Sequence, residues 1–257
     1  LLLLLTACAV SPVETPPQIA LLAPFEGRYR ELGYNALYAV QLALSEHDEQ
    51  VELLAVDDGG TPESASARAR ALELNERVIG VIVLGYVATD SGTLEAFGTL
   101  PVVVAGYWGV QDVNANVITL HHPEVPDQVL VPPREPITRL SRTVPLLAGG
   151  LVLSLPLFAE LVSDLDGVTV AASFPLPDAE FTERYLAASP FAPEPGLIAM
   201  AAYTSAQFIM EQVQADSTRE TLLTALQNAP LPDLALYIYR FDTSGVLVPI
   251  DRPVEER

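Results

Sequence analysis

The 257-residue sequence is both acidic and apolar, with 33 Asp and Glu against 13 Lys and Arg, a net charge of −20 and 50% hydrophobic residues. Such a composition can bury a substantial core, and the length suits one large α/β domain or two small lobes. The charge argues against binding to nucleic acid or to an anionic membrane surface, because both need patches of basic side chains.

The first 18 residues predict export and a lipid anchor. Residues 1–8, LLLLLTAC, resemble the end of a bacterial lipoprotein signal, in which the lipobox cysteine is lipidated. Cys8 is the one cysteine of the sequence. The apolar run is shorter than the ~20 residues that a membrane-spanning helix needs. The alternative is an ordinary secretory signal with an incidental cysteine. Val10–Gln18, with three prolines, is typical of a tether.

A βαβ unit is predicted next. Ile19–Ala23 is a short apolar run that ends at Pro24, which is typical of a buried strand. Val51–Val56 is too continuous for a strand with one wet face, so we expect it inside a parallel sheet. Between the two runs, apolar residues recur every three or four positions. They predict an amphipathic helix whose buried face holds Leu32, Ala36, Leu37, Val40, Ala43 and Leu44.

The alternation of strands and helices continues to residue 120 and predicts a doubly wound α/β sheet. Thr61 and Pro62 start a helix that runs to about Asn75, and a shorter helix is expected over Thr93–Phe97. Three further strands are predicted, at Val78–Leu84, Leu100–Ala105 and Val117–Leu120.

Five prolines interrupt the pattern within residues 121–143, so we expect a crossing segment there. Regular elements then resume. They are strands at Val144–Ala148 and Val168–Ser173, helices capped by Ser154 and Asp178, a helix at Leu197–Val213, a helix at Thr218–Gln227 with a Ser217–Glu220 capping box, and a hairpin of Ala235–Phe241 and Val246–Ile250. The predicted organisation is a signal remnant and tether (1–18), a first lobe (19–120), the crossing segment, a reduced second lobe (144–196), and a return that completes the first lobe (197–257).

Several long segments resemble one protein family. IALLAPFEGRYRELGYNALYAVQLAL, VELLAVDDGGTPESASARARAL and VIGVIVLGYVATDSGTLEAF are similar to the opening of the type I periplasmic solute-binding proteins, the branched-chain amino-acid-binding family of ABC importers. LPVVVAGYWG resembles a ligand loop of that family, and residues 144–213 resemble its later part. The resemblance implies two lobes with parallel sheets that close on a small solute, and an ABC permease as partner.

The resemblance also implies which residues bind the solute. We expect Tyr86, Thr89 and Ser91 to come from the loop after the third strand, and Gly106, Tyr107 and Trp108 from the loop after the fourth. Thr89 matches a hydroxyl that binds the carboxylate of the ligand in the family, whereas Tyr86, Tyr107 and Trp108 would form a wall. Simpler roles remain open, since Thr89 and Ser91 can cap a helix and the aromatic rings can fill space. The first loop adds Glu26, Arg28 and Tyr29, for which a solvated loop is the alternative.

The sequence departs from the family pattern at three places. Trp108 stands where a hydroxyl is expected. The turn Gly149-Gly150-Leu151 lacks the acid that often meets the ammonium group of the ligand, and 23 residues between Leu120 and Val144 are too few for a full second lobe. An amino-acid-like or amide-like solute is expected. The alternative is a sensor or protein-interaction module on the same fold, without transport.

Catalysis and metal binding find little support in the sequence. It has no G-x-S-x-G elbow, no phosphate-binding loop and no H-E-x-x-H motif. His121 and His122, with Asp127, are the candidate metal cluster of the sequence. Adjacent side chains on a strand point to opposite faces, so two adjacent histidines rarely bind one ion together. We expect no catalytic residues, no cofactor and no metal. A hydrolase on an α/β scaffold is a more distant alternative.

Overall fold

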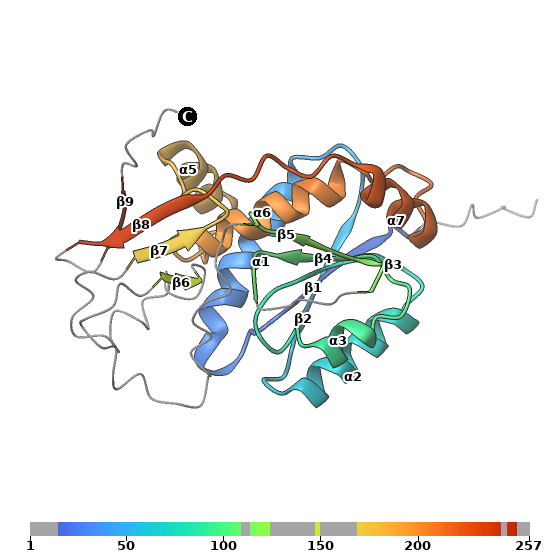
Figure 1. The fold of residues 1–257 in the computed structure, drawn as a ribbon. Coiled ribbons are helices and arrows are strands. Elements are labelled where there is room, and N and C mark those ends of the chain that lie inside the picture. The colour runs from blue at the N-terminus through green and yellow to red at the C-terminus, as the bar shows by residue number, and fades with distance from the viewer. Residues whose placement is uncertain (1–14, 109–113, 124–146, 150–168, 243–245, 251–257) are drawn as a thin grey trace, which may run out of the picture.

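The computed structural model describes residues 15–108, 114–123, 147–149, 169–242 and 246–250. The predicted lipobox, most of the crossing segment and the helix expected after Ser154 lie outside these ranges. Within them, the chain forms two sheets joined by several connections, with helices covering the larger sheet (Figure 1).

The first sheet has five parallel strands in the order β2-β1-β3-β4-β5. This confirms the doubly wound α/β prediction, and every predicted strand of the first lobe is present. The strands are β1 (Gln18–Ala23), β2 (Glu52–Asp57), β3 (Val78–Val83), β4 (Val102–Ala105) and β5 (Val117–Leu120). One expectation is wrong: β2 is an edge strand, and its residues are exposed or half-buried because it has a neighbour on one side only.

Helices cover both faces of this sheet (Figure 1). On one face lie α2 (Pro62–Leu74) and α3 (Ser91–Glu95), which contact each other. On the other lie α1 (Arg30–Ser45), which follows a 3-10 turn, η1 (Gly27–Tyr29), together with α6 (Leu197–Met210) and α7 (Arg219–Asn228). With both faces covered, β1 and β3 are buried along nearly their whole length, as parallel strands require.

The second sheet is mixed rather than parallel. Its order is β6-β7-β8-β9, and the strands are β6 (Leu147–Gly149), β7 (Thr169–Ala172), β8 (Tyr237–Phe241) and β9 (Leu247–Pro249). β6 and β7 are parallel, whereas β8 pairs antiparallel with β7 and with β9. The terminal hairpin was expected to complete the first lobe, and this is wrong: it extends the second sheet, because β7 offers β8 a free edge.

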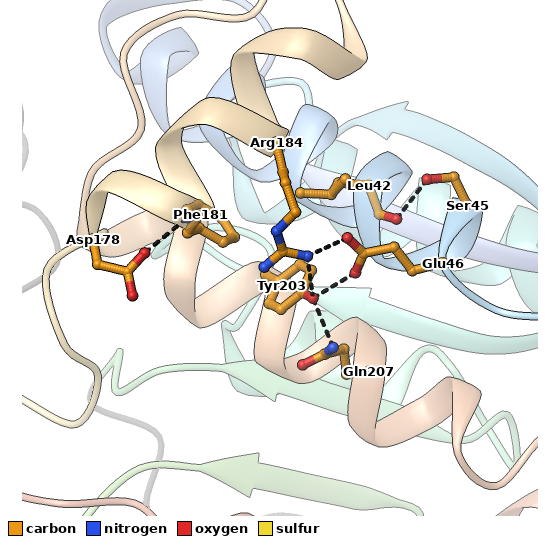
Figure 2. A network of polar contacts seen from close by, with 8 residues as sticks. All are labelled: Leu42, Ser45, Glu46, Asp178, Phe181, Arg184, Tyr203 and Gln207. Carbon is orange, nitrogen blue, oxygen red and sulfur yellow. Dashed lines mark hydrogen bonds and ion pairs between the residues drawn. The ribbon is translucent and has the colours of Figure 1, made fainter.

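The sequence position of helix α5 (Ala179–Ala188) predicts that it belongs to the second lobe, yet it packs against α1, and its Phe181 ring contacts Tyr203 of α6. Its predicted cap is present, since Asp178 Oδ1 accepts a hydrogen bond from Phe181 N at 2.7 Å. Figure 2 shows the polar contacts that hold it: Arg184 pairs with Glu46, which follows α1. Tyr203 of α6 donates to Glu46 Oε2 at 2.5 Å. The helix is therefore attached to the first lobe.

The described elements require the backbone to pass between the two sheets three times: after β5, between β7 and α5, and between α7 and β8. Hydrogen bonds join these passages to one another and to β8. His122 N donates to Ser173 Oγ at 2.8 Å and so links the first passage to the second. Tyr239 of β8 accepts from Leu176 N at 2.9 Å and donates to Phe174 O at 3.3 Å. These hydrogen bonds thus tie the connecting segments together between the sheets.

The capping box of α7 uses other residues than predicted. Thr218 is the N-cap, and its hydroxyl and that of Thr221 accept from each other's backbone N–H. Ser217 instead accepts from Gln214 N at 2.8 Å, in the preceding turn. A threonine can replace the acidic partner because its hydroxyl oxygen also accepts a hydrogen bond.

Arg219 joins α7 to the end of α2. Its guanidinium donates to Glu73 O at 2.8 Å, to Asn75 O at 2.6 Å and to Val78 O at 2.8 Å. Carbonyls at the end of a helix have no partner within the helix, so this one side chain satisfies the end of α2 and the start of β3 together.

We predict that Arg219→Ala lowers the free energy of unfolding by about 2–3 kcal/mol, because the hydrogen bonds from a charged donor to the backbone carbonyls are lost. Urea unfolding measures the change. Arg70→Ala, an exposed arginine of α2, is the matched control and should change the stability by less than about 0.5 kcal/mol. Equal effects of the two substitutions would contradict this role.

Burial affects the tyrosines of the core. It raises the pKa of Tyr239 and of Tyr86 to about 12, and it raises the pKa of Tyr185 as well. In the unfolded chain tyrosine ionises near pH 10. A group whose pKa is raised in the folded state stabilises the protein below the unfolded pKa, and this stabilisation is lost as the pH rises through the folded pKa.

We therefore expect the free energy of unfolding to fall above pH 10, by about 1 kcal/mol at pH 11 for each tyrosine with a pKa near 12. Urea unfolding at pH 8, 10 and 11 measures this slope. Tyr185→Phe, at a fully buried position, should flatten it, whereas Tyr34→Phe, at a position 40% exposed, should not. If the unsubstituted protein and both variants show the same slope, the ionisation of buried Tyr185 does not cause the loss of stability.

Candidate ligand-binding site

The loops at the carboxyl ends of β1 and β3 leave the first sheet at the point where its strand order reverses. The chain goes from β1 to one side, to β2, and from β3 to the other side, to β4. In open parallel sheets the loops diverge at such a point and leave a crevice in which ligands bind. The fold therefore places a candidate site between the β1 loop and the β3 loop.

Asp57, the last residue of β2, fixes the β1 loop. Its Oδ1 accepts from Phe25 N at 2.7 Å and from Glu26 N at 3.1 Å, and its Oδ2 accepts from Gly59 N at 2.9 Å. Three backbone donors satisfy a carboxylate well. Asp57 thus has the turn-stabilising role that its position in the Asp57-Asp58-Gly59-Gly60 turn suggests.

Two glycines allow the elements around the crevice to approach closely. A Cβ on Gly33 of α1 would lie 2.2 Å from Pro24 O, so only glycine fits against the end of β1. Gly85 has φ +95°, a conformation that favours glycine, and a Cβ there would lie 3.1 Å from Pro24 Cδ. These contacts bring the β1 loop, α1 and the β3 loop together.

The hollow that results has a volume of about 240 Å³. It is bounded by the three loops that follow β1, β2 and β3 and by the start of α1. Its lining residues are Pro24, Glu26, Gly27, Tyr29, Leu32, Asp58, Gly60, Gly85, Tyr86 and Val87. We call it the switch-point pocket. Its size suits a small solute, although it is below the range typical of drug-sized ligands.

Tyr86 is the one of the six predicted ligand residues that lines the switch-point pocket in the described part of the chain. Its ring lies edge-on to Trp108, with centroids 5.2 Å apart, and to Tyr29, with centroids 6.4 Å apart. Trp108 is 5% exposed, and its Nε1 donates to Ala105 O at 2.8 Å. Trp108 therefore supports Tyr86 from behind, and Tyr29, from the first loop, joins the wall.

The two predicted hydroxyl groups have different surroundings. Thr89 is buried, and its Oγ1 donates to Gly85 O at 2.8 Å, which closes the β3 loop on itself. Ser91 is exposed at the start of α3. The cap of α3 is Asp90, whose carboxylate accepts from Gly92 N at 3.0 Å. Capping was the simpler alternative for Thr89 and Ser91, and the structure gives that role to their neighbour.

Gly106 and Tyr107 follow β4, beside the pocket rather than in its lining. Gly106 has φ +85° and makes the turn that brings Trp108 back over the end of the strand. Tyr107 is half-buried, and its ring lies 5.1 Å from that of His121. The loop after β4 thus reaches the first passage between the sheets.

Asp58 is a charged lining residue that is absent from the predicted ligand residues, because two acids before Gly59-Gly60 are typical of a turn and cap element. It is 2% exposed and its Oδ1 accepts from Gly60 N at 2.8 Å. Burial raises the pKa of this carboxyl; the bond from Gly60 opposes the shift, and the charge of Asp57 adds to it. The feature of the sequence that could have indicated Asp58 is its position, since β2 ends at Asp57 and Asp58 belongs to the loop that follows.

Within the described ranges, no group of three or more His, Cys, Asp or Glu residues is arranged to hold a metal ion. None of the helices in that part of the chain combines the length and the hydropathy that a membrane crossing needs.

No protein-family model matches the sequence, and a search of curated proteins finds no match. Solved structures share its fold. An extracellular ligand-binding receptor from Verminephrobacter eiseniae has a TM-score of 0.69 at 13% identity, over 91% of this chain and all of that one. A branched-chain amino acid transporter substrate-binding protein from Streptococcus pneumoniae, in complex with isoleucine, has a TM-score of 0.63 at 10% identity, over 92% of this chain and all of that one.

A third structure shares the fold with a different ligand. It is a solute-binding protein of an ABC transporter from R. palustris in complex with benzoate, with a TM-score of 0.65 at 14% identity, over 92% of this chain and 96% of that one. With the five-stranded parallel sheet and the smaller second sheet, these similarities show that the chain has the type I periplasmic-binding-protein fold, the fold of many solute-binding proteins of ABC transporters.

Proposed function

We propose that this protein is an extracytoplasmic solute-binding protein of an ABC importer, anchored by a lipid at Cys8, and that it binds a small amino-acid-like or amide-like solute between its lobes. The observation that carries the proposal is the switch-point pocket, which lies where open α/β sheets bind ligands. The similar structures with isoleucine and benzoate support it, because both are small solutes bound by the same fold.

Tyr86 is the expected ligand residue that lines the pocket in the described part of the chain. Tyr29 lies beside its ring and Trp108 behind it. Tyr107 and Gly106 would extend the wall toward the second sheet. Thr89 and Ser91 remain our proposed hydrogen-bond donors to the solute. Thr89 already donates its proton to Gly85 O, so it would act on the solute only by exchanging that bond.

The mechanism we propose is closure of the second lobe over the first. Three passages of the backbone join the sheets, and the bonds of His122 and Tyr239 hold these passages together. A solute that contacts both lobes favours the closed arrangement by its differential affinity for the two states. The closed arrangement would then be the one that an ABC permease recognises.

Thermal unfolding of the purified protein against amino acids, short peptides, amides and sugars tests this function. A ligand that binds only the folded state adds about 2.7 kcal/mol of stability at a hundredfold excess over its dissociation constant. We expect at least one solute to raise the midpoint, and we expect Tyr29→Ala, in the pocket wall, to abolish the shift.

The matched control is Tyr237→Ala. Tyr237 is half-buried like Tyr29, but it lines a separate hollow on the second sheet. It should leave the ligand-induced shift unchanged. No shift with any solute, in a protein that unfolds cooperatively, would contradict a solute-binding role and favour a sensor or protein-interaction module on the same fold.

A further inference from the structure

Asp58 is a buried acid in the switch-point pocket. Asp58 is 2% exposed and lines the pocket, and Gly60 N donates a hydrogen bond to one oxygen of its carboxylate. The other oxygen, Oδ2, extends toward Gly85, since a Cβ on Gly85 would lie 4.0 Å from it. The carboxylate is therefore fixed between the β2 loop and the β3 loop, on the wall of the pocket.

No positive charge compensates this acid among the described side chains. The pocket lining contains Glu26 and Asp58 and no described basic side chain. The ion pairs of the described residues that are resolved, Arg77–Glu52 and Arg184–Glu46, do not involve Asp58. A buried carboxyl normally needs a partner, because burial disfavours its charge. Because Asp58 lines the pocket, a cation bound in the pocket would supply that partner.

The remaining lining is apolar or aromatic. Pro24, Leu32 and Val87 contribute carbon surface, and the rings of Tyr29 and Tyr86 stand edge-to-face. Aromatic rings beside a carboxylate are a favourable surrounding for an organic cation, because the ring faces attract positive charge and the apolar walls accept its carbon atoms. An anion in the same place would be repelled by Asp58.

From this geometry we infer that the pocket takes a solute with an ammonium or other organic cation group, and that Asp58 is the residue that binds it. The inference rests on the proposed solute-binding function and adds the charge of the solute. In this arrangement the cation lies against the first lobe, on the loop after β2.

The stability of the protein without ligand provides an independent test of the charge on Asp58. Burial raises the pKa of Asp58, so its ionisation opposes folding at neutral pH and this cost disappears at low pH. The charge of Asp57 acts on it, and Glu26, Tyr29 and Tyr86 line the same pocket; none of these four side chains supplies a positive charge. Asp58→Asn keeps the acceptor for Gly60 N. It should raise the unfolding midpoint at pH 7, and the gain should shrink toward pH 4.

The direct test compares solutes of equal carbon chain that carry a cationic, neutral or anionic end group. Calorimetric titration of the purified protein would use three pairs of aliphatic and aromatic probes: butylamine and 3-phenylpropylamine, butyramide and 3-phenylpropanamide, butyrate and 3-phenylpropanoate. We expect the amines to bind at least about tenfold more tightly than the matched amides and carboxylates. Asp58→Asn should remove this preference. Glu95→Gln, at an exposed carboxylate of α3, should keep it.

The outcomes distinguish a failure of the cation preference from a failure of the proposed solute-binding function. Amides or carboxylates that bind as tightly as the amines, or a cation preference that survives Asp58→Asn, would overturn the inference and leave a solute-binding protein. If no probe binds, and the wider set of solutes gives no thermal shift either, the proposed function fails and the inference fails with it.

Discussion

The reversal of strand order between β1 and β3 is the constraint on which the rest of the structure depends. Both strands are buried on their two faces, so helices must cover the sheet on each side. The loop after β1 therefore turns toward α1 on one face, and the loop after β3 turns toward α3 on the other. The switch-point pocket is the space that these two diverging loops leave, and Gly33 and Gly85 keep it small by letting α1 and the β3 loop contact Pro24.

Adjacent carboxylates at the end of β2 serve different purposes because adjacent side chains point in different directions. Asp57 faces backbone N–H groups of the β1 loop and of its own turn, which balance its charge. Asp58 faces the pocket, with one such donor. The first carboxylate stabilises the frame of the site, whereas the second gives the site its charge. A net charge of −20 does not distinguish these roles, since it describes the surface as a whole.

The local structure of the first lobe could be predicted from the sequence because it depends on nearby residues. The strands and the start of α2 at Thr61-Pro62 follow from apolar runs and from cap chemistry within a few positions. The position of β2 at the sheet edge and the pairing of β8 with β7 could not be predicted, because both depend on contacts between distant segments. In the site, Tyr86 was expected because the family resemblance implies that the loop after the third strand binds the ligand, and Tyr86 does line the pocket. Asp58 was missed, because sequence adjacency does not show which of two acids faces a cavity.

The three passages of the backbone between the sheets also affect how the protein withstands damage. A protein whose lobes share one linker separates into two pieces when a protease cuts that linker. Here a single cut between α7 and β8, at the exposed Leu231, leaves two covalent passages intact. The terminal hairpin is paired with β7 and Tyr239 is bonded to Phe174 and Leu176, so the cleaved segment stays attached without a peptide bond. The connection between the two sheets thus tolerates a single cut at this position, because the remaining passages and the paired strands keep the two parts together.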